Sequence, residues 1–428
     1  MTNEDATKNV SGLKKKPTPT ANRPEQSAAD RRPWPFKLGE AVSFDEVTIT
    51  FNKKKVFIWT GVVIGALVVI GLIVYLVLVA RLAQESEGTD FLGSLPLLGE
   101  KQRTVSGLSG MACEHPTRRP IAVMLAADPI NRPVSGFSQA DIVWELPVLA
   151  SNVTRLLAAY QCNEPTDIGS VRSARHDYLF IAEGMDAIIA HWGGSYHALN
   201  RIAAGEFKTI NALTNPFKAY FRKTHLPSPY NGFTTYERLW NALEQLEYRV
   251  ETEFEGYDFK DDVAVAARPA GGTLTIAWPG AFRVHYEYNP ATNRYERFWA
   301  GVRQIDAADG EQVAPSAVII MRATNGFADG PGGYNEVGIE GTGRLEVYQD
   351  GGVITGTWHK NELRKTDPVQ FLDESGEEIT FTRGQLWVMT PSDTIEVTWE
   401  ELEAEPQRNP TDPTPVIEAS PVGSGLPG

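Results

Sequence analysis

Residues 121–161 read IAVMLAADPINRPVSGFSQADIVWELPVLASNVTRLLAAYQ and contain three short apolar runs separated by polar turn residues. The runs cover residues 121–127, 141–148 and 154–161, and this pattern is typical of buried β-strands. If the first and third strands pair antiparallel, the segment before the first strand lies beside the end of the third. That pairing would bring together Cys113 and Cys162, the only two cysteines of the chain. We therefore predict a disulfide, with two buried free thiols as the alternative.

The apolar pattern after these strands changes between helical and strand-like spacing. Residues 178–185 have the spacing of a helix, and residues 187–192 (AIIAHW) resemble another buried strand. Residues 235–246 (TYERLWNALEQL) predict a second helix, because Thr234 or Thr235 can cap its first turn. Strands and helices therefore alternate over residues 119–255, which we interpret as a mixed α/β domain.

The second half of the chain contains short strand-like runs separated by turns such as Asn289-Pro290. The runs cover residues 274–278, 282–288, 294–300, 317–323, 344–350, 352–358 and 385–390. The polar residues 256–272 are typical of a linker, so a smaller β-rich domain is expected over residues 273–400. The predicted fold class is α+β.

One segment predicts a membrane anchor. Residues 56–80 (VFIWTGVVIGALVVIGLIVYLVLVA) contain no charge and would span roughly 37 Å as a helix, enough to cross a bilayer core of about 30 Å. A buried core helix would have a polar face, and a cleaved signal peptide would be shorter and nearer the start. Lysines 53–55 precede the segment, so the positive-inside rule places residues 1–55 in the cytoplasm and the rest outside. We predict a single N-terminal transmembrane helix acting as an uncleaved signal anchor.

Charge and composition fit this division. Residues 1–55 hold eleven basic and seven acidic residues, a net charge of +4, so the remainder of this −14 chain carries −18. An acidic ectodomain argues against nucleic acid as a partner, because phosphate binding needs concentrated positive charge. We interpret residues 1–55 as a disordered tail, 81–118 as a tether, and 401–428 as a disordered tail rich in Pro, Gly and Ser.

The segment 169–178, GSVRSARHDY, places two arginines three residues apart before an expected helix start. Arg172 and Arg175 can reach one side at this spacing, and with Arg132 and Arg155 they could bind a carboxylate or phosphate. The alternative is a structural ion network in which these arginines pair with the acids at positions 141 and 145.

A second candidate is HWGGSYH, residues 191–197, where a strand ends in a glycine turn. The turn could expose backbone N–H groups to a ligand, present Ser195 as a nucleophile, or be a plain turn. The spacing of His191 and His197 is neither that of a metal motif nor helical, so no metal and no cofactor are predicted. Asp141 and Glu145, four apart on one strand, are widely spaced for a glycosidase pair.

Several blocks resemble a known family. The matching blocks are RPIAVMLAADPINRPVSGFSQADIVWELPV (119–148), TRLLAAYQ (154–161), DIGSVRSAR (167–175), the hairpin 288–297 and DGGVITGTW (350–358). They resemble the YerB-like lipoproteins, domain-of-unknown-function family 3048, over about residues 115–395. The resemblance implies a bacterial cell-envelope protein tethered by a lipid or a membrane helix, with no established activity. Where the family has R-K-x-P-H-N, this chain reads RKTHLPSPYN (222–231), so Tyr230 occupies the histidine position, Asn231 aligns with the asparagine, and His225 lies five residues before Tyr230.

These observations favour a membrane-anchored extracytoplasmic binding or structural module with an arginine-lined cleft for an anionic small molecule or cell-wall ligand. The alternative is a cell-wall-acting hydrolase or transferase that uses the turn at 191–195 with the arginines as clamps, although no strong catalytic signature is present. The candidate ligand-binding residues are Arg132, Asp141, Glu145, Arg155, Arg172, Ser173, Arg175, His191, Gly193, Gly194, Ser195 and Asn231.

Overall fold

A computed structural model describes residues 69, 71–75, 103–149, 153–330 and 332–402. The chain divides into two compact units, residues 1–91 and 92–428. In the first unit, residue 69 and residues 71–75 are helical and exposed. The rest of the predicted membrane span, the N-terminal tail, most of the tether and residues 403–428 lie outside the described residues. In the part of the chain that is described, no helix is both long enough and apolar enough to cross a bilayer.

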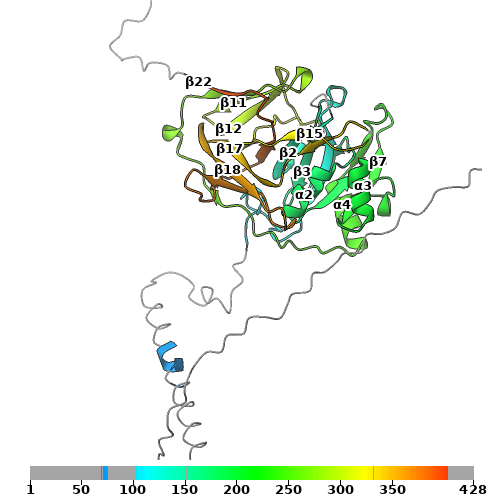
Figure 1. Cartoon of the computed structure of the whole chain (residues 1–428), viewed down its shortest axis with the longest axis horizontal. Helices are drawn as coiled ribbons and strands as arrows, with labels where there is room; N and C mark the ends of the chain where they lie inside the picture. The colour runs from blue at the N-terminus through cyan, green and yellow to red at the C-terminus, as the bar shows by residue number, and fades with distance from the viewer. Residues whose placement is uncertain (1–68, 70, 76–102, 150–152, 331, 403–428) are drawn as a thin grey trace, which may run out of the picture. The chain divides into compact units, whose positions relative to one another are not determined.

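A ten-stranded mixed sheet forms the centre of the second unit (Figure 1). Its strand order is β19-β18-β17-β14-β21-β2-β3-β1-β5-β6. The strands are β1 (Ile121–Ala126), β2 (Ile142–Leu149), β3 (Val153–Tyr160), β5 (Ile188–His191), β6 (Thr209–Asn211), β14 (Ala317–Met321), β17 (Gly341–Gln349), β18 (Gly352–Lys360), β19 (Gln370–Asp373) and β21 (Leu386–Met389). The expected antiparallel pairing of β1 with β3 is present and places Ile121 opposite Tyr160.

Both halves of the sequence contribute to this sheet. Strands β1 to β6 come from the first predicted domain, and β14 to β21 come from the second. The two sets meet where β2 pairs in parallel with β21, with Ile142 opposite Leu386 and Glu145 opposite Met389. The segments 119–255 and 273–400 are therefore joined by backbone hydrogen bonds across one continuous sheet.

A five-stranded sheet, β13-β12-β11-β10-β22, is built from the second half of the chain alone. Its strands are β10 (Gly272–Ile276), β11 (Val284–Asn289), β12 (Arg294–Trp299), β13 (Val302–Arg303) and β22 (Val397–Glu401). In β12 every second residue is buried, so Tyr295, Arg297 and Trp299 share the inner face. The smaller sheets contain β4 (Ile168–Gly169), β7 (Tyr220–Arg222), β8 (Gly232–Thr234), β9 (Phe259–Lys260), β15 (Asn325–Phe327), β16 (Asn335–Val337) and β20 (Phe381–Thr382). The observed fold is thus a mixed α/β arrangement around one large sheet, together with a β-rich region.

Among the described residues of this unit, the α-helices are α2 (His176–Gly184), α3 (Tyr196–Ala203) and α4 (Tyr236–Gln245). The two predicted helices correspond to α2 and α4, whereas α3 was not predicted. Thr235 caps α4, because its side chain accepts a hydrogen bond from the N–H of Arg238. Short 3₁₀ helices occupy η2 (Pro129–Asn131), η3 (Phe137–Gln139), η4 (Pro216–Lys218), η5 (Val265–Ala267) and η6 (Gly280–Phe282).

Apolar side chains are buried on both faces of the large sheet. Along β1, Ile121 and Val123 belong to one hydrophobic cluster, while Ala122 and Met124 belong to another. Successive side chains of a strand point to opposite faces, so the two clusters cover the two sides of the sheet. This double burial explains why the sequence of β1 is a continuous apolar run.

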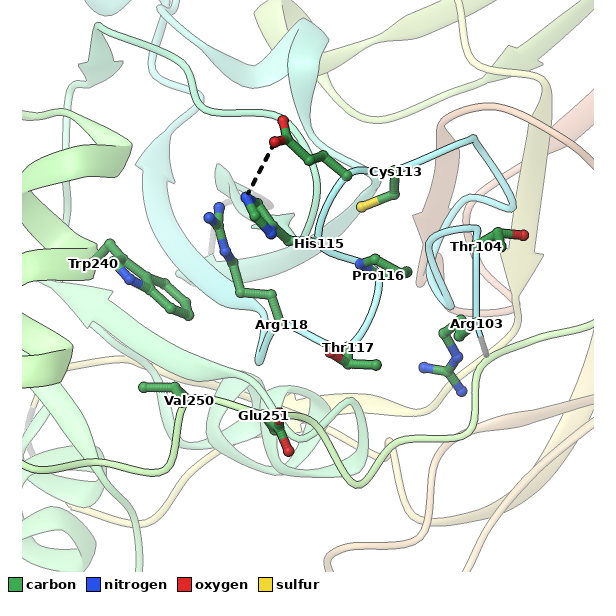
Figure 2. A pocket seen from close by; sticks show the side chains of 11 residues that line it. Arg103, Thr104, Cys113, His115, Pro116, Thr117, Arg118, Trp240, Val250 and Glu251 are labelled. Carbon is green, nitrogen blue, oxygen red and sulfur yellow. Dashed lines mark ion pairs between the residues drawn. The ribbon is translucent and has the colours of Figure 1, made fainter. Parts of the chain in front are cut away.

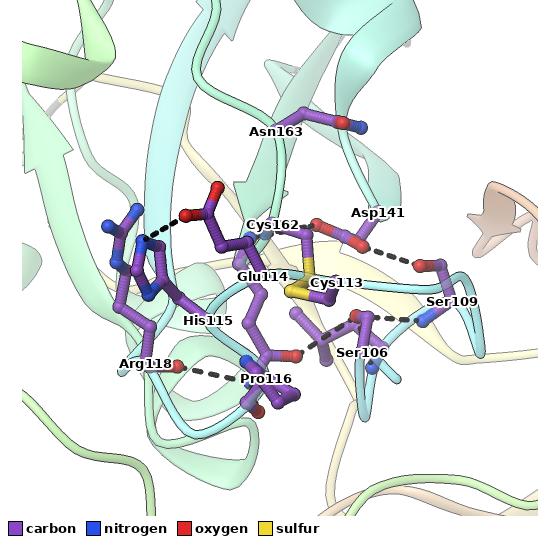
Figure 3. The surroundings of a disulfide bond; sticks show 12 residues. Ser106, Ser109, Cys113, Glu114, His115, Pro116, Arg118, Asp141, Cys162 and Asn163 are labelled. Atoms are coloured by element: carbon purple, nitrogen blue, oxygen red, sulfur yellow. Dashed lines mark hydrogen bonds and ion pairs between the residues drawn. A yellow bond between two sulfur atoms is a disulfide. The ribbon is translucent and has the colours of Figure 1, made fainter. Parts of the chain in front are cut away.

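The predicted disulfide between Cys113 and Cys162 is present, with Cα atoms 5.4 Å apart (Figure 3). Asp141 organises the chain around it. Its Oδ2 atom accepts hydrogen bonds from the backbone N–H groups of Gln161 at 2.8 Å and Cys162 at 3.3 Å, and its Oδ1 atom accepts one from Ser109 at 2.5 Å. Asp141 therefore ties the segment before β1 to the end of β3.

Candidate functional site

The segment that contains Arg172 and Arg175 runs between β4 and α2 and is held by backbone hydrogen bonds on both sides. The N–H of Arg172 donates to Met124 O at 2.8 Å, which fixes the segment to β1. The N–H of Ala174 donates to Gly193 O at 2.9 Å, which fixes it to the turn after β5. The two sequence motifs of interest are therefore neighbours in the fold.

Three arginine side chains gather here, and we call Arg155, Arg172 and Arg175 the arginine cluster. From β3, Arg155 Nη1 donates to Ser173 O at 2.9 Å. Arg175 Nη1 donates to Ala174 O at 3.0 Å and to the same Ser173 O at 3.4 Å, so Arg155 and Arg175 converge on one carbonyl oxygen. Arg172 Nη1 lies 3.4 Å from Pro229 O. Ser173 thus contributes its backbone carbonyl to the cluster.

Among the described residues, no carboxylate forms an ion pair with any member of the arginine cluster. The Nε atom of each member is also buried without a hydrogen-bond partner. Arg155 and Arg175 are both only 5% exposed. Because buried charges are normally paired, this cluster holds positive charge that an anion could neutralise.

The pKa values of these side chains reflect their burial and the closeness of the three positive charges. Burial, together with the neighbouring charges of Arg175 and Arg172, lowers the pKa of Arg155 to about 9, and Asp128 opposes the shift. Burial also lowers the pKa of Arg175 to about 10. Both groups remain protonated at neutral pH, so the cluster is cationic there.

Aromatic rings flank the cluster. The guanidinium of Arg172 lies 4.8 Å from the ring centroid of Tyr230, and that of Arg175 lies 4.7 Å from that of Tyr334. Stacking of this kind holds a guanidinium in place while its edge keeps free donors. Tyr230 also lines a neighbouring cavity of about 270 Å³, so the cluster and the cavity adjoin through this ring.

The cavity beside Tyr230 has polar and cationic walls. Lys223 Nζ contacts the carboxylate of Asp167 at 2.6 Å, and Ser135 donates a hydrogen bond to the same carboxylate. His225, five residues before Tyr230, is exposed at the cavity wall. Arg132 also lines the cavity, but its guanidinium donates to Ala127 O and Ala281 O and lies 3.9 Å from the centroid of Trp299. Arg132 therefore has a structural role and does not join the arginine cluster.

Asp141 and Glu145 do not pair with the arginine cluster, so the alternative ion network is absent. Glu145 is fully buried, and its Oε2 atom lies 2.6 Å from Nη2 of Arg297 on β12. It also accepts hydrogen bonds from Thr154 at 2.8 Å and Trp387 at 3.2 Å. Asp141 is bonded near the disulfide and Glu145 to Arg297. Glu145 thereby links the large sheet to the five-stranded sheet.

The turn at 191–195 is organised by its own hydrogen bonds. His191 is fully buried; its Nδ1 atom lies 2.6 Å from Gly193 O and its Nε2 atom 3.1 Å from Thr209 Oγ1. Burial lowers its pKa. Ser195 caps α3 by accepting a hydrogen bond from the N–H of Ala198 at 3.3 Å. The ring of His191 and the hydroxyl of Ser195 therefore belong to separate hydrogen-bond sets.

The remaining predicted residues, Gly193, Gly194 and Asn231, each make local contacts. Gly193 has a φ of 65°, a left-handed conformation that suits glycine. Gly194 forms a parallel bridge with Ala174, and a Cβ atom there would lie 3.3 Å from Ala174 O. Asn231 accepts a hydrogen bond from Arg222 at 2.6 Å through its side chain.

A separate cavity of about 440 Å³ lies beside the disulfide (Figure 2). Its walls include Cys113, His115, Arg118, Trp240 and Glu251. Arg118 pairs with Glu164 and lies 4.7 Å from the ring centroid of Trp240. None of the predicted ligand-binding residues lines this cavity.

At the start of α2, Asp177 and His176 form a buried contact next to Arg175, with 3.2 Å between His176 Nε2 and Asp177 Oδ1. Burial raises the pKa of Asp177 to about 8 and lowers the pKa of His176 to about 4. Near pH 7 the carboxyl therefore keeps its proton and the imidazole is neutral. A neutral pair costs less to bury than two ions would.

This shift predicts a pH-dependent effect of Asp177→Asn. Between about pH 4 and about pH 8 the folded protein holds a proton on Asp177 that the unfolded chain has lost, so the contribution of this group to stability falls as pH rises. The asparagine side chain does not titrate, so the variant lacks this pH dependence. Thermal melts of the variant and the wild type should therefore diverge in favour of the variant from about pH 4 to about pH 8. A constant difference over that range would contradict the protonated state.

Comparison with known proteins identifies the class to which this fold belongs. Two family models match the chain: the protein of unknown function (DUF3048) N-terminal domain over residues 105–249, and its C-terminal domain over residues 274–388. The chain therefore belongs to the DUF3048 family. It is similar to "Putative lipoprotein YerB" of Bacillus subtilis, with 29% identity over 288 residues that cover 66% of this chain and 84% of that protein. The crystal structure of the YerB protein from Bacillus subtilis superposes with a TM-score of 0.62 and 26% identity, covering 69% of this chain and all of that one.

Proposed function

We propose that this protein is a membrane-anchored extracytoplasmic protein of the cell envelope that binds an anionic ligand at the arginine cluster. The observation that carries the proposal is a set of three neighbouring guanidinium groups with no carboxylate partner among the described residues. A carboxylate or phosphate group would supply the missing acceptors, and guanidinium forks bind both in bidentate fashion.

The proposed location is supported by the sequence and by the relative. Residues 56–80 are uncharged and follow three lysines, as expected for a signal anchor with the C-terminal part outside. A disulfide such as Cys113–Cys162 persists in oxidising compartments. The name of the Bacillus subtilis relative describes a lipoprotein, which would also be held at a membrane.

Binding is favoured over the hydrolase alternative by the geometry at residues 191–195. A serine nucleophile needs a base within hydrogen-bond reach. Ser195 instead caps α3, and both ring nitrogens of His191 contact other groups. A ligand site needs only the arginine cluster and its flanking rings.

The proposal predicts that Arg172→Lys weakens anion binding without unfolding the protein. Lysine keeps the charge but cannot form a bidentate pair, so affinity should fall about tenfold or more. Binding of inorganic phosphate, glycerol phosphate and a dicarboxylate to the full chain in detergent can be measured by calorimetry. Arg344→Lys is a matched control, because Arg344 is exposed and pairs with exposed Asp393.

The two variants separate the outcomes. Weaker binding by Arg172→Lys, with Arg344→Lys unchanged, is the expected result. A wild-type protein that binds none of the three anions, or an Arg172→Lys variant that binds all of them as the wild type does, would refute the site.

A further inference from the structure

An exposed loop between β6 and β7 presents two large apolar side chains to solvent. Leu213 is 65% exposed and Phe217 is 51% exposed. The same loop contains three non-glycine residues with positive φ: Asn215 at 41°, Phe217 at 51° and Lys218 at 60°. Left-handed backbone at such positions is uncommon, and an aromatic residue kept exposed in this conformation points to a role outside the core.

Cations surround these apolar side chains. Lys218, Arg222 and Arg238 are all exposed. Arg238 Nη1 donates to Lys218 O at 2.9 Å, which fixes the start of α4 against the loop. Among the described residues, none of the three forms an ion pair with a carboxylate. We call these residues, together with Leu213 and Phe217, the basic apolar face.

Further contacts make this face continuous. The guanidinium of Arg238 lies 5.3 Å from the ring centroid of Phe221 on β7, and that of Arg222 lies 4.2 Å from the ring centroid of Trp192. Trp192 in turn lies 5.8 Å from Tyr220, centroid to centroid. In Figure 1, β7 and helix α3 lie on the side of the domain away from β22 and β11.

We propose that the basic apolar face docks onto an anionic lipid bilayer surface. Exposed apolar side chains flanked by Lys and Arg are the arrangement that binds membrane interfaces: the apolar groups enter the headgroup region and the cations contact anionic lipids. The residues after position 55 carry a net charge of −18, so an anionic surface repels most of the domain. At the basic apolar face, the cations can attract anionic lipids despite this overall repulsion. Docking there would orient the domain on the membrane.

The apolar side chains decide between a membrane and a soluble polyanion as the occupant. A polyanion would gain from Lys218, Arg222 and Arg238 but nothing from Leu213 and Phe217. A bilayer interface gains from both. The two side chains therefore favour lipid, and a soluble polyanion becomes an outcome of the test.

The test uses the full chain reconstituted into two kinds of vesicle, phosphatidylcholine alone and phosphatidylcholine mixed with phosphatidylglycerol. Hydrogen exchange of residues 211–222 reports the ratio of docked to undocked domain. We expect slower exchange in the anionic vesicles only. Lys218→Gln should lower the docked ratio about fivefold, because each cation near an anionic surface contributes about 1 kcal/mol. Phe217→Ser should lower it further, while Leu363→Ser, which changes a side chain that is 93% exposed, should leave it unchanged.

Three results would overturn the proposal. The first is equal exchange in the two kinds of vesicle. The second is anion-dependent protection that survives both Phe217→Ser and Lys218→Gln. The third is equal protection when soluble polyphosphate is added to the protein in phosphatidylcholine vesicles, since that would identify a polyanion surface.

Discussion

Replacing Glu145 with Gln should lower the free energy of unfolding by about 3–5 kcal/mol, because it leaves the charge of Arg297 buried without its counter-ion. Both side chains are fully buried, and the Oε2 and Nη2 atoms lie 2.6 Å apart. Arg297 also donates from Nε to the hydroxyl of Tyr286 at 2.9 Å, and its guanidinium lies 4.3 Å from the ring centroid of Trp387. Rings and a neutral hydroxyl do not replace a carboxylate.

Thermal or urea unfolding of the full chain in detergent measures this effect. Arg297→Met should destabilise the protein by a similar amount, since it strands Glu145. The double variant Glu145→Met, Arg297→Met should be less destabilised than either single variant, because an apolar pair removes both buried charges. Asp393→Asn, which breaks the exposed pair with Arg344, is the control and should change stability by at most about 1 kcal/mol. Single variants as stable as this control would show that the buried pair contributes little.

The role of Arg297 illustrates what the sequence can and cannot predict. The run 294–300, RYERFWA, alternates so that Tyr295, Arg297 and Trp299 share one face, and period-two spacing places an arginine between two aromatic residues of the core. Its partner, Glu145, is 152 residues earlier in the chain. Only the pairing of β2 with β21, and the packing of the five-stranded sheet nearby, brings them together.

The sequence does not predict the continuous sheet, for the same reason. Apolar runs predict the individual strands, and the polar composition of residues 256–272 predicts a linker. Composition carries no information on which strand of one segment pairs with which strand of another. The parallel pairing of Ile142 with Leu386 is such a long-range choice, made by the packing of both faces.

In the candidate site too, some features have a local sequence signal and others depend on contacts between distant segments. The arginine segment and the turn at 191–195 are neighbours because the N–H of Ala174 donates to Gly193 O, a contact that the local spacing of neither motif predicts. The flanking rings, Tyr230 and Tyr334, come from distant segments and had no local signal, although Tyr230 already stood out as a departure from the family motif. Helix α3 does have a local signal, because Ser195 is a good N-cap residue before YHALNRIA.

Removing the disulfide should destabilise the protein almost as much as stranding a buried charge. Cys113 and Cys162 are separated by 49 residues, and closing a loop of that length stabilises the folded state by about 4 kcal/mol in the chain-entropy model. In this model the disulfide acts mainly by restricting the unfolded chain. The folded structure around it should persist without the bond, because Asp141 still binds Ser109 and the backbone N–H of Gln161. The double variant Cys113→Ser, Cys162→Ser should therefore fold with unchanged near-ultraviolet circular dichroism but melt at a lower temperature.

Thiol labelling provides the independent measurement for this pair. In the wild-type chain, unfolded in denaturant without reductant, neither cysteine should react, and both should react once a reductant is added. A single variant, Cys113→Ser, should expose one reactive thiol under the unreduced condition and match the double variant in stability. If both cysteines of the unfolded, unreduced wild type were labelled, the bond would be absent in the purified protein and the double variant should then melt with the wild type. Because Cys113 also lines the cavity beside Trp240, loss of the bond should loosen that wall first, which faster hydrogen exchange of residues 103–118 would reveal.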